Sequence, residues 1–352
     1  MTRRTPTALA LAAVAALAAA TPAAGASRTI TLEGWPAREM AFSGDHLVWT
    51  EAATVRVDPR RIAGSPPGAV RFDYYRAETS RVRLAARSTR FAGAYETPVS
   101  VRTSIAAMTP GVLAPTGGGG FVTVPGSRRF APPVARCCDA DGIETVVESD
   151  GRDGAPVTVA ATALGDVVRT VRLGAGGAAT VRDADLASGA VTDTPVPGTT
   201  RAGLVALSAT ARAWVDPAAP ATLLLQPTGG AAPEAVALPG AALRVWAAPG
   251  LAVVAVRRGA RVLVVRVDEG AAPRAQRVWA GARLPRVAAG GGSVAVADGR
   301  AVLAARRGAL RVVVRGRRVV DAVGVDGARV AWVERGQRRG ARVGVVRLGR
   351  VR

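Results

Sequence analysis

The chain has 352 residues, 47 of them basic and 26 acidic, which gives a formal net charge of +21 at pH 7. A single-sign excess of this size attracts anionic partners and is sensitive to salt. The 49% of hydrophobic residues is an ordinary fraction for a folded chain, and the single His excludes a metal site built from several imidazoles.

The first 26 residues predict a secretory signal peptide. Arg3 and Arg4 form a basic start, Ala8–Ala20 is an unbroken apolar run, and Ala24-Gly25-Ala26 is an A-x-A cleavage site. The apolar run of about 13 residues is too short to span a bilayer, and no later stretch is apolar enough to anchor the chain. We therefore expect the mature protein, residues 27–352, to be exported and soluble after cleavage near Ala26, with no membrane span.

One phrase recurs along the chain. It reads AFSGDHLVWTE from Ala41 and GVDGARVAWVE from Gly324, and looser copies begin at Ala206 and Ala288. Alignment of the copies puts four residues at one place, namely Trp49, Trp214, Val296 and Trp332. A fifth place near residue 254 completes a period of about 40 residues, which is typical of β-sheet units that stack on their neighbours. We expect the three Trp residues to be equivalent core residues between these units.

Short β-branched runs separated by Gly turns fill each unit. Leu251–Val256 is followed by an Arg-Arg-Gly turn and by Ala260–Val267. The same scheme recurs in Ala295–Ala297, Ala301–Ala305 and Leu310–Val314. These runs predict antiparallel meanders. Since no helical periodicity of about ten residues or more occurs outside the signal peptide, the predicted class is all-β.

A Gly turn, a buried strand and two shorter strands in every repeat resemble the secreted bacterial β-propellers with TolB-like or WD40-like repeats. Their blades open with an apolar residue, Ser-Pro-Asp-Gly, a short strand and an aromatic residue. Phe42-Ser43-Gly44 to Trp49 and Val325-Asp326-Gly327 to Trp332 match this opening in part. The resemblance covers residues 36–51 and 201–352, and it implies a single β-propeller domain over residues 27–352.

We expect about seven blades of mostly four antiparallel strands, with six or eight as alternatives. Four repeats occupy residues 201–352, and three longer blades would fill the rest of the mature chain. Each repeated phrase is expected to contain the inner strand of its blade. Arg28–Leu32 is expected to close the ring as the outer strand of the last blade by pairing with Val343–Leu348, because closure removes exposed strand edges.

An acidic residue ends each copy of the phrase: Glu51, Asp216, Asp298 and Glu334. These four residues either gather around one mouth of the central channel or each pair locally with an Arg, and we favour local pairing. His46 stands just before a strand, where sister copies have Arg212 and Arg329. We interpret it as a turn residue.

The segment from Cys137 to Glu148 contains a partial calcium-binding pattern. Asp139, Asp141 and Glu148 fall on the third, fifth and twelfth places of a Ca²⁺ loop, but Cys137 occupies the first, where a carboxylate belongs. A turn between two strands explains the same residues. For Cys137 and the adjacent Cys138, a vicinal disulfide, an intermolecular bridge and free thiols all stay open.

These patterns identify no catalytic, cofactor-binding or metal-binding residues. They favour a non-catalytic, monomeric propeller that binds a protein or a cell-envelope component. One alternative is an anionic-polymer binder, because residues 257–352 hold 23 Arg against 6 acids; we expect such binding to be weak, since the Arg pairs lie at turns. The other alternative is a hydrolase or lyase that uses channel carboxylates.

Overall fold

The computed structural model describes residues 30–33, 37–57, 72–83, 112–117, 120–124, 134–137, 145–147, 156–270, 272–338 and 341–351. Within these residues the chain forms strands β1 to β27 and one 3-10 turn at Ala175–Gly177, and it contains no α-helix. None of the described helical residues makes a helix with the length and hydropathy needed to cross a membrane.

The strands form seven antiparallel sheets, which we number as blades in chain order, starting each from its innermost strand. Blade 1 contains β2 (Ala37–Ser43), β3 (His46–Val57) and β4 (Phe72–Arg83). Blade 2 contains β5 (Val112–Gly117), β6 (Gly120–Val124), β7 (Val134–Cys137) and β8 (Thr145–Val147). Blade 3 contains β9 (Val157–Leu164), β10 (Val167–Leu173), β11 (Ala178–Asp185) and β12 (Val191–Thr199).

The four remaining blades follow residue 201, as the repeats predicted. Blade 4 contains β13 (Val205–Leu207), β14 (Ala211–Val215), β15 (Thr222–Pro227) and β16 (Glu234–Ala237). Blade 5 contains β17 (Ala241–Ala248), β18 (Leu251–Arg258), β19 (Arg261–Asp268) and β20 (Ala275–Gly281). Blade 6 contains β21 (Arg286–Gly290), β22 (Ser293–Asp298), β23 (Ala301–Ala305) and β24 (Arg311–Arg315). Blade 7 contains β25 (Val320–Asp326), β26 (Arg329–Arg338), β27 (Ala341–Arg350) and the N-terminal strand β1 (Ile30–Glu33).

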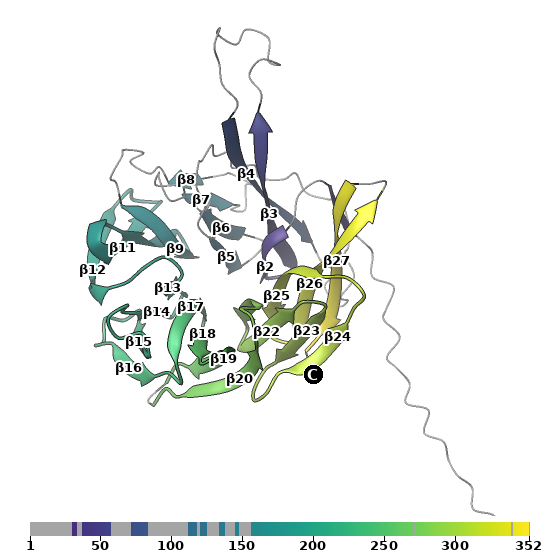
Figure 1. The fold of residues 1–352 in the computed structure, drawn as a ribbon. Helices are drawn as coiled ribbons and strands as arrows, with labels where there is room; N and C mark the ends of the chain where they lie inside the picture. The colour runs from purple at the N-terminus through teal and green to yellow at the C-terminus, as the bar shows by residue number, and fades with distance from the viewer. Residues whose placement is uncertain are drawn as a thin grey trace, which may run out of the picture.

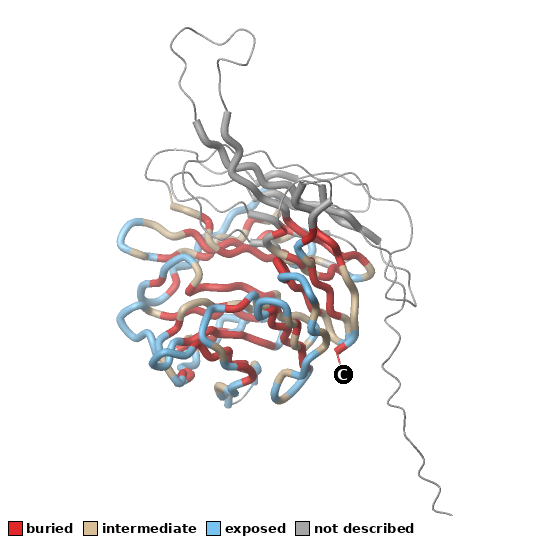
Figure 2. The backbone as a smooth tube through the Cα atoms, turned by 45° about the vertical axis from the view of Figure 1, so that its right-hand side comes forward, coloured by how far each residue is buried: buried red, intermediate tan, exposed pale blue. Residues whose placement is uncertain are grey.

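The blades follow one another around a ring (Figure 1). The innermost strand of each blade contacts that of the next, and β25 of blade 7 contacts β2 of blade 1. The buried residues lie along the faces that adjacent blades turn toward each other, whereas exposed residues gather at the turns and outer strands (Figure 2). The all-β class and the count of about seven blades are confirmed.

The repeated phrase forms the hairpin between the first and second strands of a blade. In blade 1 a two-residue turn, in which Gly44 adopts a φ of +58°, joins Ser43 of β2 to His46 of β3. A residue with a positive φ fits this turn, because the backbone twist of the turn then matches the twist of the flanking strands. The apolar part of the phrase is the second strand, so its assignment to the inner strand was wrong. The second strand has a neighbour on both sides and is therefore more buried than the innermost strand, as in β18, where Leu251–Val256 are all buried.

The three Trp residues pack between blades, as predicted. Trp49 and Trp214 are completely buried, and Trp332 is 6% exposed. Trp49 lies in a cluster with Ala331 and Val333 of blade 7. Trp214 and Trp332 likewise pack against the blade that precedes their own. The aligned place therefore fills each interface from the same side.

The N-terminal strand pairs with the segment of the last blade that the sequence predicted as its partner. β1 runs antiparallel to β27, with Ile30 opposite Val346 and Glu33 opposite Val343. It gives blade 7 its fourth strand. Arg28, Thr29 and the predicted signal peptide, residues 1–26, lie outside the described residues. The calcium-like residues Asp139, Asp141 and Glu148 and the side-chain state of Cys138 also lie outside them, while Cys137 ends β7.

Removal of β1 should destabilise the ring. A chain that begins at Gly34 should melt several degrees below one that begins at Ser27, because the outer edge of β27 and part of a blade face would become exposed. Thermal unfolding followed by circular dichroism measures the difference. Equal melting temperatures would show that the pairing does not hold the ring closed.

Truncation of each buried Trp residue should destabilise the folded protein. Trp49→Ala, Trp214→Ala and Trp332→Ala should each lower the free energy of unfolding by roughly 3–5 kcal/mol, because each leaves a large cavity between blades. Urea denaturation measures the loss. Leu164→Ala is the control, since Leu164 is 65% exposed and its truncation should change stability by less than about 0.5 kcal/mol. Stability losses of similar size in all four variants would contradict the burial of the three Trp residues between blades.

Candidate binding site at the ring axis

All four recurring acids lie on or directly after second strands, one strand away from the ring axis. The side chains that the structure describes, those of Asp216, Asp298 and Glu334, belong to three different blades. Asp216 follows β14 and accepts hydrogen bonds from the Thr199 hydroxyl at 3.0 Å and the Ala218 backbone N–H at 2.9 Å. The backbone bond from Ala218 is the main reason why the pKa of Asp216 lies below its usual value.

Glu334 makes its polar contacts within its own blade, whereas Asp216 of blade 4 accepts a hydrogen bond from Thr199 of blade 3. Glu334 Oε1 accepts a hydrogen bond from the Trp332 indole at 3.2 Å, and Glu334 Oε2 lies 3.6 Å from Arg347 Nε. Asp298 is exposed at the end of β22. Glu51 pairs with Ala37 through the backbone, and its side chain lies outside the described residues. The predicted local pairing with an Arg is therefore found for Glu334. Asp216 instead accepts hydrogen bonds from a hydroxyl group and from backbone N–H groups.

His46 lies at the base of the first hairpin. It is the first residue of β3 and pairs with Ser43 across the two-residue turn. The imidazole is buried, with Nδ1 2.8 Å from Asp45 Oδ1. Arg329, at the same position in blade 7, donates hydrogen bonds to Asp326 and to the Gly44 carbonyl. These contacts support a structural role for the position.

Three other charged residues share one layer of the ring. On the innermost strands, Glu39 lies opposite Thr50, Arg244 opposite Ala255 and Arg286 opposite Ala297. Each partner directly follows the aligned Trp place of its blade, so the three residues are equivalent in blades 1, 5 and 6. The equivalent residues of blades 4 and 7 are the buried apolar Leu204 and Ala322. We name Glu39, Arg244 and Arg286 the axial cluster.

The axial cluster joins blades that are not neighbours. Arg244 Nη2 lies 3.8 Å from Glu39 Oε1, and the two side chains are 25% and 23% exposed. Blades 1 and 5 are separated by blades 6 and 7 on one side and by blades 2 to 4 on the other (Figure 1). A side-chain contact between their innermost strands therefore crosses the middle of the ring. The remaining exposure shows that water reaches both groups.

Burial is the main influence on the pKa values of Glu39 and Arg244. Burial raises the pKa of Glu39 to about 7, and the positive charges of Arg244 and Arg286 offset this effect only in part. Burial also lowers the pKa of Arg244, although the charge of Glu39 opposes that shift. The Arg244 guanidinium lies 5.2 Å from the centroid of the Trp246 ring. This distance is typical of a cation–π contact.

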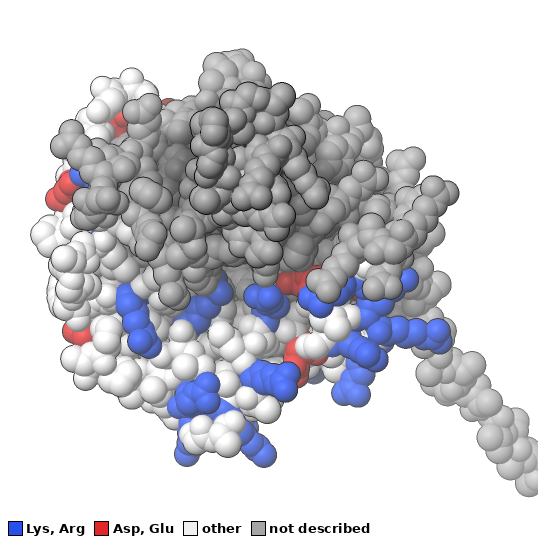
Figure 3. Space-filling view, turned by 45° about the horizontal axis from the view of Figure 1, so that its top comes forward, with Lys and Arg blue, Asp and Glu red and all other residues white. Residues whose placement is uncertain are grey.

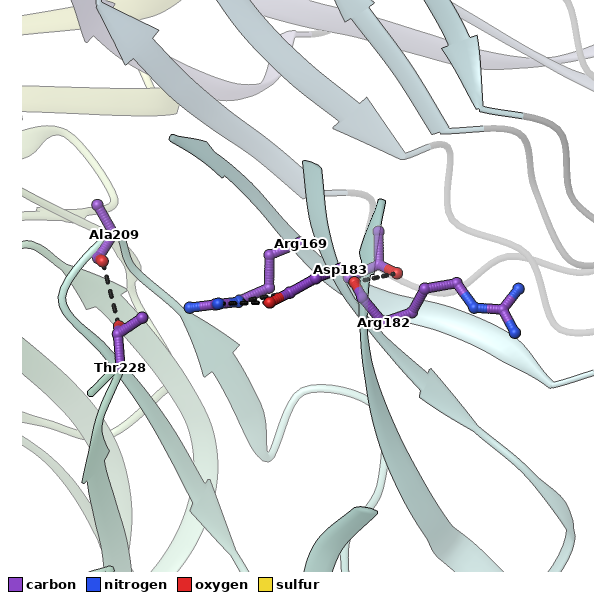
Figure 4. A network of polar contacts seen from close by, with 6 residues as sticks. Arg169, Arg182, Asp183, Ala209 and Thr228 are labelled. Atoms are coloured by element: carbon purple, nitrogen blue, oxygen red, sulfur yellow. Dashed lines mark hydrogen bonds and ion pairs between the residues drawn. The ribbon is translucent and has the colours of Figure 1, made fainter. Parts of the chain in front are cut away.

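Some arginines elsewhere in the fold are paired with a carboxylate of their own blade. Arg169 of β10 donates two hydrogen bonds of 2.6 Å to Asp183 of β11 (Figure 4). Arg335 makes a similar pair with Asp321. Within the described part of the chain, by contrast, neither Arg244 nor Arg286 donates a hydrogen bond to a protein acceptor. Their guanidinium donors are not used to hold the fold.

The Arg pairs of the C-terminal third do not form one patch. Arg257 and Arg258 end β18, and Arg317 and Arg318 precede β25, so both pairs lie where the second and fourth strands of a blade end. Arg306 and Arg307 follow β23, a third strand, and lie on the opposite face of the ring. Figure 3 shows basic side chains in several separate groups. The Arg338 side chain and Arg339 lie outside the described residues.

The repeated phrase did not predict the axial cluster, although the sequence contains a pattern that identifies its residues. Glu39, Arg244 and Arg286 each stand ten positions before the aligned place of their repeat, as do Leu204 and Ala322. A comparison of that column across the repeats would have shown charge in three blades and apolar residues in two. Among the described residues, no group of three or more His, Cys, Asp and Glu side chains is arranged to hold a metal ion.

The raised pKa of Glu39 should make stability depend on pH. Folding strengthens proton binding to this carboxyl, so its ionisation destabilises the folded state as pH rises from about 4.5 to about 7. Glu39→Gln should therefore leave the free energy of unfolding unchanged near pH 4 and increase it by up to about 3 kcal/mol near pH 8. Urea denaturation at the two pH values measures this difference. A gain that is the same at both would contradict the assigned ionisation.

Neither a protein-family model nor a curated protein sequence matches the chain. Solved structures do resemble it. The β-propeller domain of the Trilobed protease from Pyrococcus furiosus is 8% identical, with a TM-score of 0.55 over 90% of this chain and 94% of that domain. YCF48, solved with a D1 peptide, is 11% identical with a TM-score of 0.49 over 92% and 96% of the two chains. TolB from Acinetobacter baumannii is 13% identical with a TM-score of 0.42 over 66% and 52%. The likeness to the Pyrococcus furiosus propeller, together with the seven sheets around the ring, shows that the chain has the fold of a β-propeller.

Proposed function

We propose that the protein is a non-catalytic binding or scaffold module that recognises a protein or cell-envelope component through the axis of its propeller. One observation carries this proposal: the axial cluster holds one carboxylate and two guanidinium groups whose hydrogen-bond donors are not used by the fold. Unused Arg donors at a partly dry site are suited to recognition, because Arg binds anionic groups through several directed hydrogen bonds.

The arrangement of acidic residues supports binding over catalysis. Carboxylate-based hydrolysis uses two acidic groups that face one substrate bond about 5–10 Å apart. The axial layer described above contains a single carboxylate, Glu39, and the recurring acids lie on separate second strands. We therefore retain the hydrolase or lyase only as the alternative that measured turnover would establish.

The proposed setting is outside the cytoplasm. Its support is the predicted signal peptide, with Arg3, Arg4, Ala8–Ala20 and the site ending at Ala26. Anionic polymers remain the second candidate partner, supported by the net charge of the chain. The separation of Arg306 and Arg317 onto opposite faces argues against one continuous polymer-binding patch.

A capture experiment tests the proposal. The mature chain, residues 27–352, would be immobilised and incubated with the cell-envelope fraction of the organism that encodes it. We expect at least one protein to be retained by the wild type and to be lost with Arg244→Gln/Arg286→Gln. Mass spectrometry identifies the retained protein, and rebinding of that protein in purified form shows that the contact is direct.

The matched control is Arg261→Gln/Arg277→Gln, which removes two exposed arginines from β19 and β20 of blade 5. It should retain the same partner. Equal recovery of every protein by the wild type and the axial double variant would contradict binding at the axis. Turnover of an envelope substrate that depends on Glu39 would contradict the non-catalytic assignment.

A further inference from the structure

We propose that the axial cluster is a binding site for a carboxylate group, in which a ligand carboxylate takes the place of Glu39 between Arg244 and Arg286. This inference rests on the proposed function and names the chemistry that the axis recognises. The site would take a carboxylate carried by a peptide, either at its C-terminus or on an acidic side chain.

The geometry leaves the Arg244 donors available. Its 3.8 Å separation from Glu39 exceeds the range of a hydrogen bond between a guanidinium and a carboxylate. Trp246 lies two residues along β17, and its ring lies 5.2 Å from the guanidinium carbon. A guanidinium that rests on an aromatic face keeps the N–H groups at its edge free to form a bidentate pair with a planar carboxylate.

Glu39 indicates the kind of group that fits. Its carboxylate lies 3.8 Å from Arg244, and the charge of Arg286 also acts on it, so it stands in for the carboxylate of a ligand. With Glu39 ionised the cluster carries a net charge of +1, and with Glu39 protonated it carries +2. A ligand anion therefore competes with Glu39, and protonation of Glu39 relieves that competition.

The other charged groups near β2 are engaged elsewhere. Asp321 and Asp326 of β25 are paired with Arg335 and Arg329, and Glu334 of β26 lies beside Arg347. β5 carries no charged residue. The side chains of Arg38 and Glu51 lie outside the described residues. Among the described residues, Arg244 and Arg286 are the charged groups that act on the pKa of Glu39, so the charge of the axial cluster changes with the protonation of this one carboxyl.

The binding test uses the mature chain and small probes. Isothermal titration calorimetry would compare N-acetyl-glycyl-glycine, which has a free carboxylate, with its C-terminal amide. N-acetyl-glutamate amide in a third titration presents the carboxylate on a side chain. We expect both acids to bind and the amide not to bind. Binding of one acid alone identifies whether the terminus or the side chain is the recognised source, and either result supports a carboxylate site.

The pH dependence of binding distinguishes displacement of Glu39 by the ligand from a general attraction between opposite charges. For wild type, the dissociation constant should increase roughly tenfold between pH 6 and pH 8, because a carboxyl that titrates near pH 7 loses its proton over this range. Glu39→Gln should bind at pH 8 as tightly as wild type does at pH 6, with no pH dependence. Arg244→Gln should abolish binding, whereas Arg277→Gln should leave it unchanged.

Three results would overturn the inference. They are equal binding of the acid and the amide, parallel pH profiles for wild type and Glu39→Gln, and inorganic phosphate binding more than tenfold tighter than the acids. If Arg244→Gln fails to fold, the Glu39→Gln profile still decides. If the probes fail but an envelope protein is still retained through Arg244 and Arg286, only the ligand chemistry is wrong; if the probes bind but no protein is retained, the proposed function is wrong.

Discussion

The contact between neighbouring blades is the constraint on which this structure depends. A four-stranded sheet made mainly of Ala and Val cannot bury both faces alone, so each blade relies on the next around the ring. The same hairpin solves this problem repeatedly: a Gly turn joins the innermost strand to a second strand, and the aligned residue of that second strand fills the interface with the preceding blade. Trp49, Trp214 and Trp332 fill three of these interfaces. Because the first hairpins of blades 1, 4, 5, 6 and 7 share this register, the residues ten positions before the aligned place form one layer around the axis.

That layering explains how residues far apart in the sequence come together. Glu39 and Arg244 are separated by half of the ring, yet they lie at the same height because each faces the residue that follows the aligned place. The equivalent residues of blades 4 and 7, Leu204 and Ala322, are apolar and serve packing. The layer is charged in blades 1, 5 and 6, and there the burial that stabilises the rest of the ring acts against charge, which raises the pKa of Glu39 to about 7. The difference between this cluster and saturated pairs such as Arg169 with Asp183 is the physical basis for assigning it to binding.

The sequence predicted the architecture better than the site. Period, Gly turns and β-branched runs depend on local backbone preferences and on burial, so they predicted the all-β class, the interface Trp residues and the position of β1. The apolar run of the phrase was placed on the innermost strand because burial was equated with closeness to the axis; in a blade, the second strand is the more buried one. The same error directed attention to Glu51, Asp216, Asp298 and Glu334. The axial cluster forms because innermost strands of different blades place their side chains at the same height. A local sequence pattern cannot predict such a contact between distant blades. The three residues can nevertheless be found by comparing the repeats at the position ten residues before the aligned place.

The central claim is that Glu39 lies at the axis beside Arg244, where the charge of Arg286 also acts on it, and that it exchanges with an incoming carboxylate. Its most direct test is a carbon-13 NMR titration of the glutamate side-chain carboxyls in the mature protein, with the Glu39 signal assigned by its loss in Glu39→Gln. The account predicts a midpoint near pH 7 in the free protein and a higher midpoint when N-acetyl-glycyl-glycine is bound, because the bound anion disfavours ionisation of its neighbour. A midpoint near the ordinary value of about 4.5, or one that the acid does not move, would contradict it.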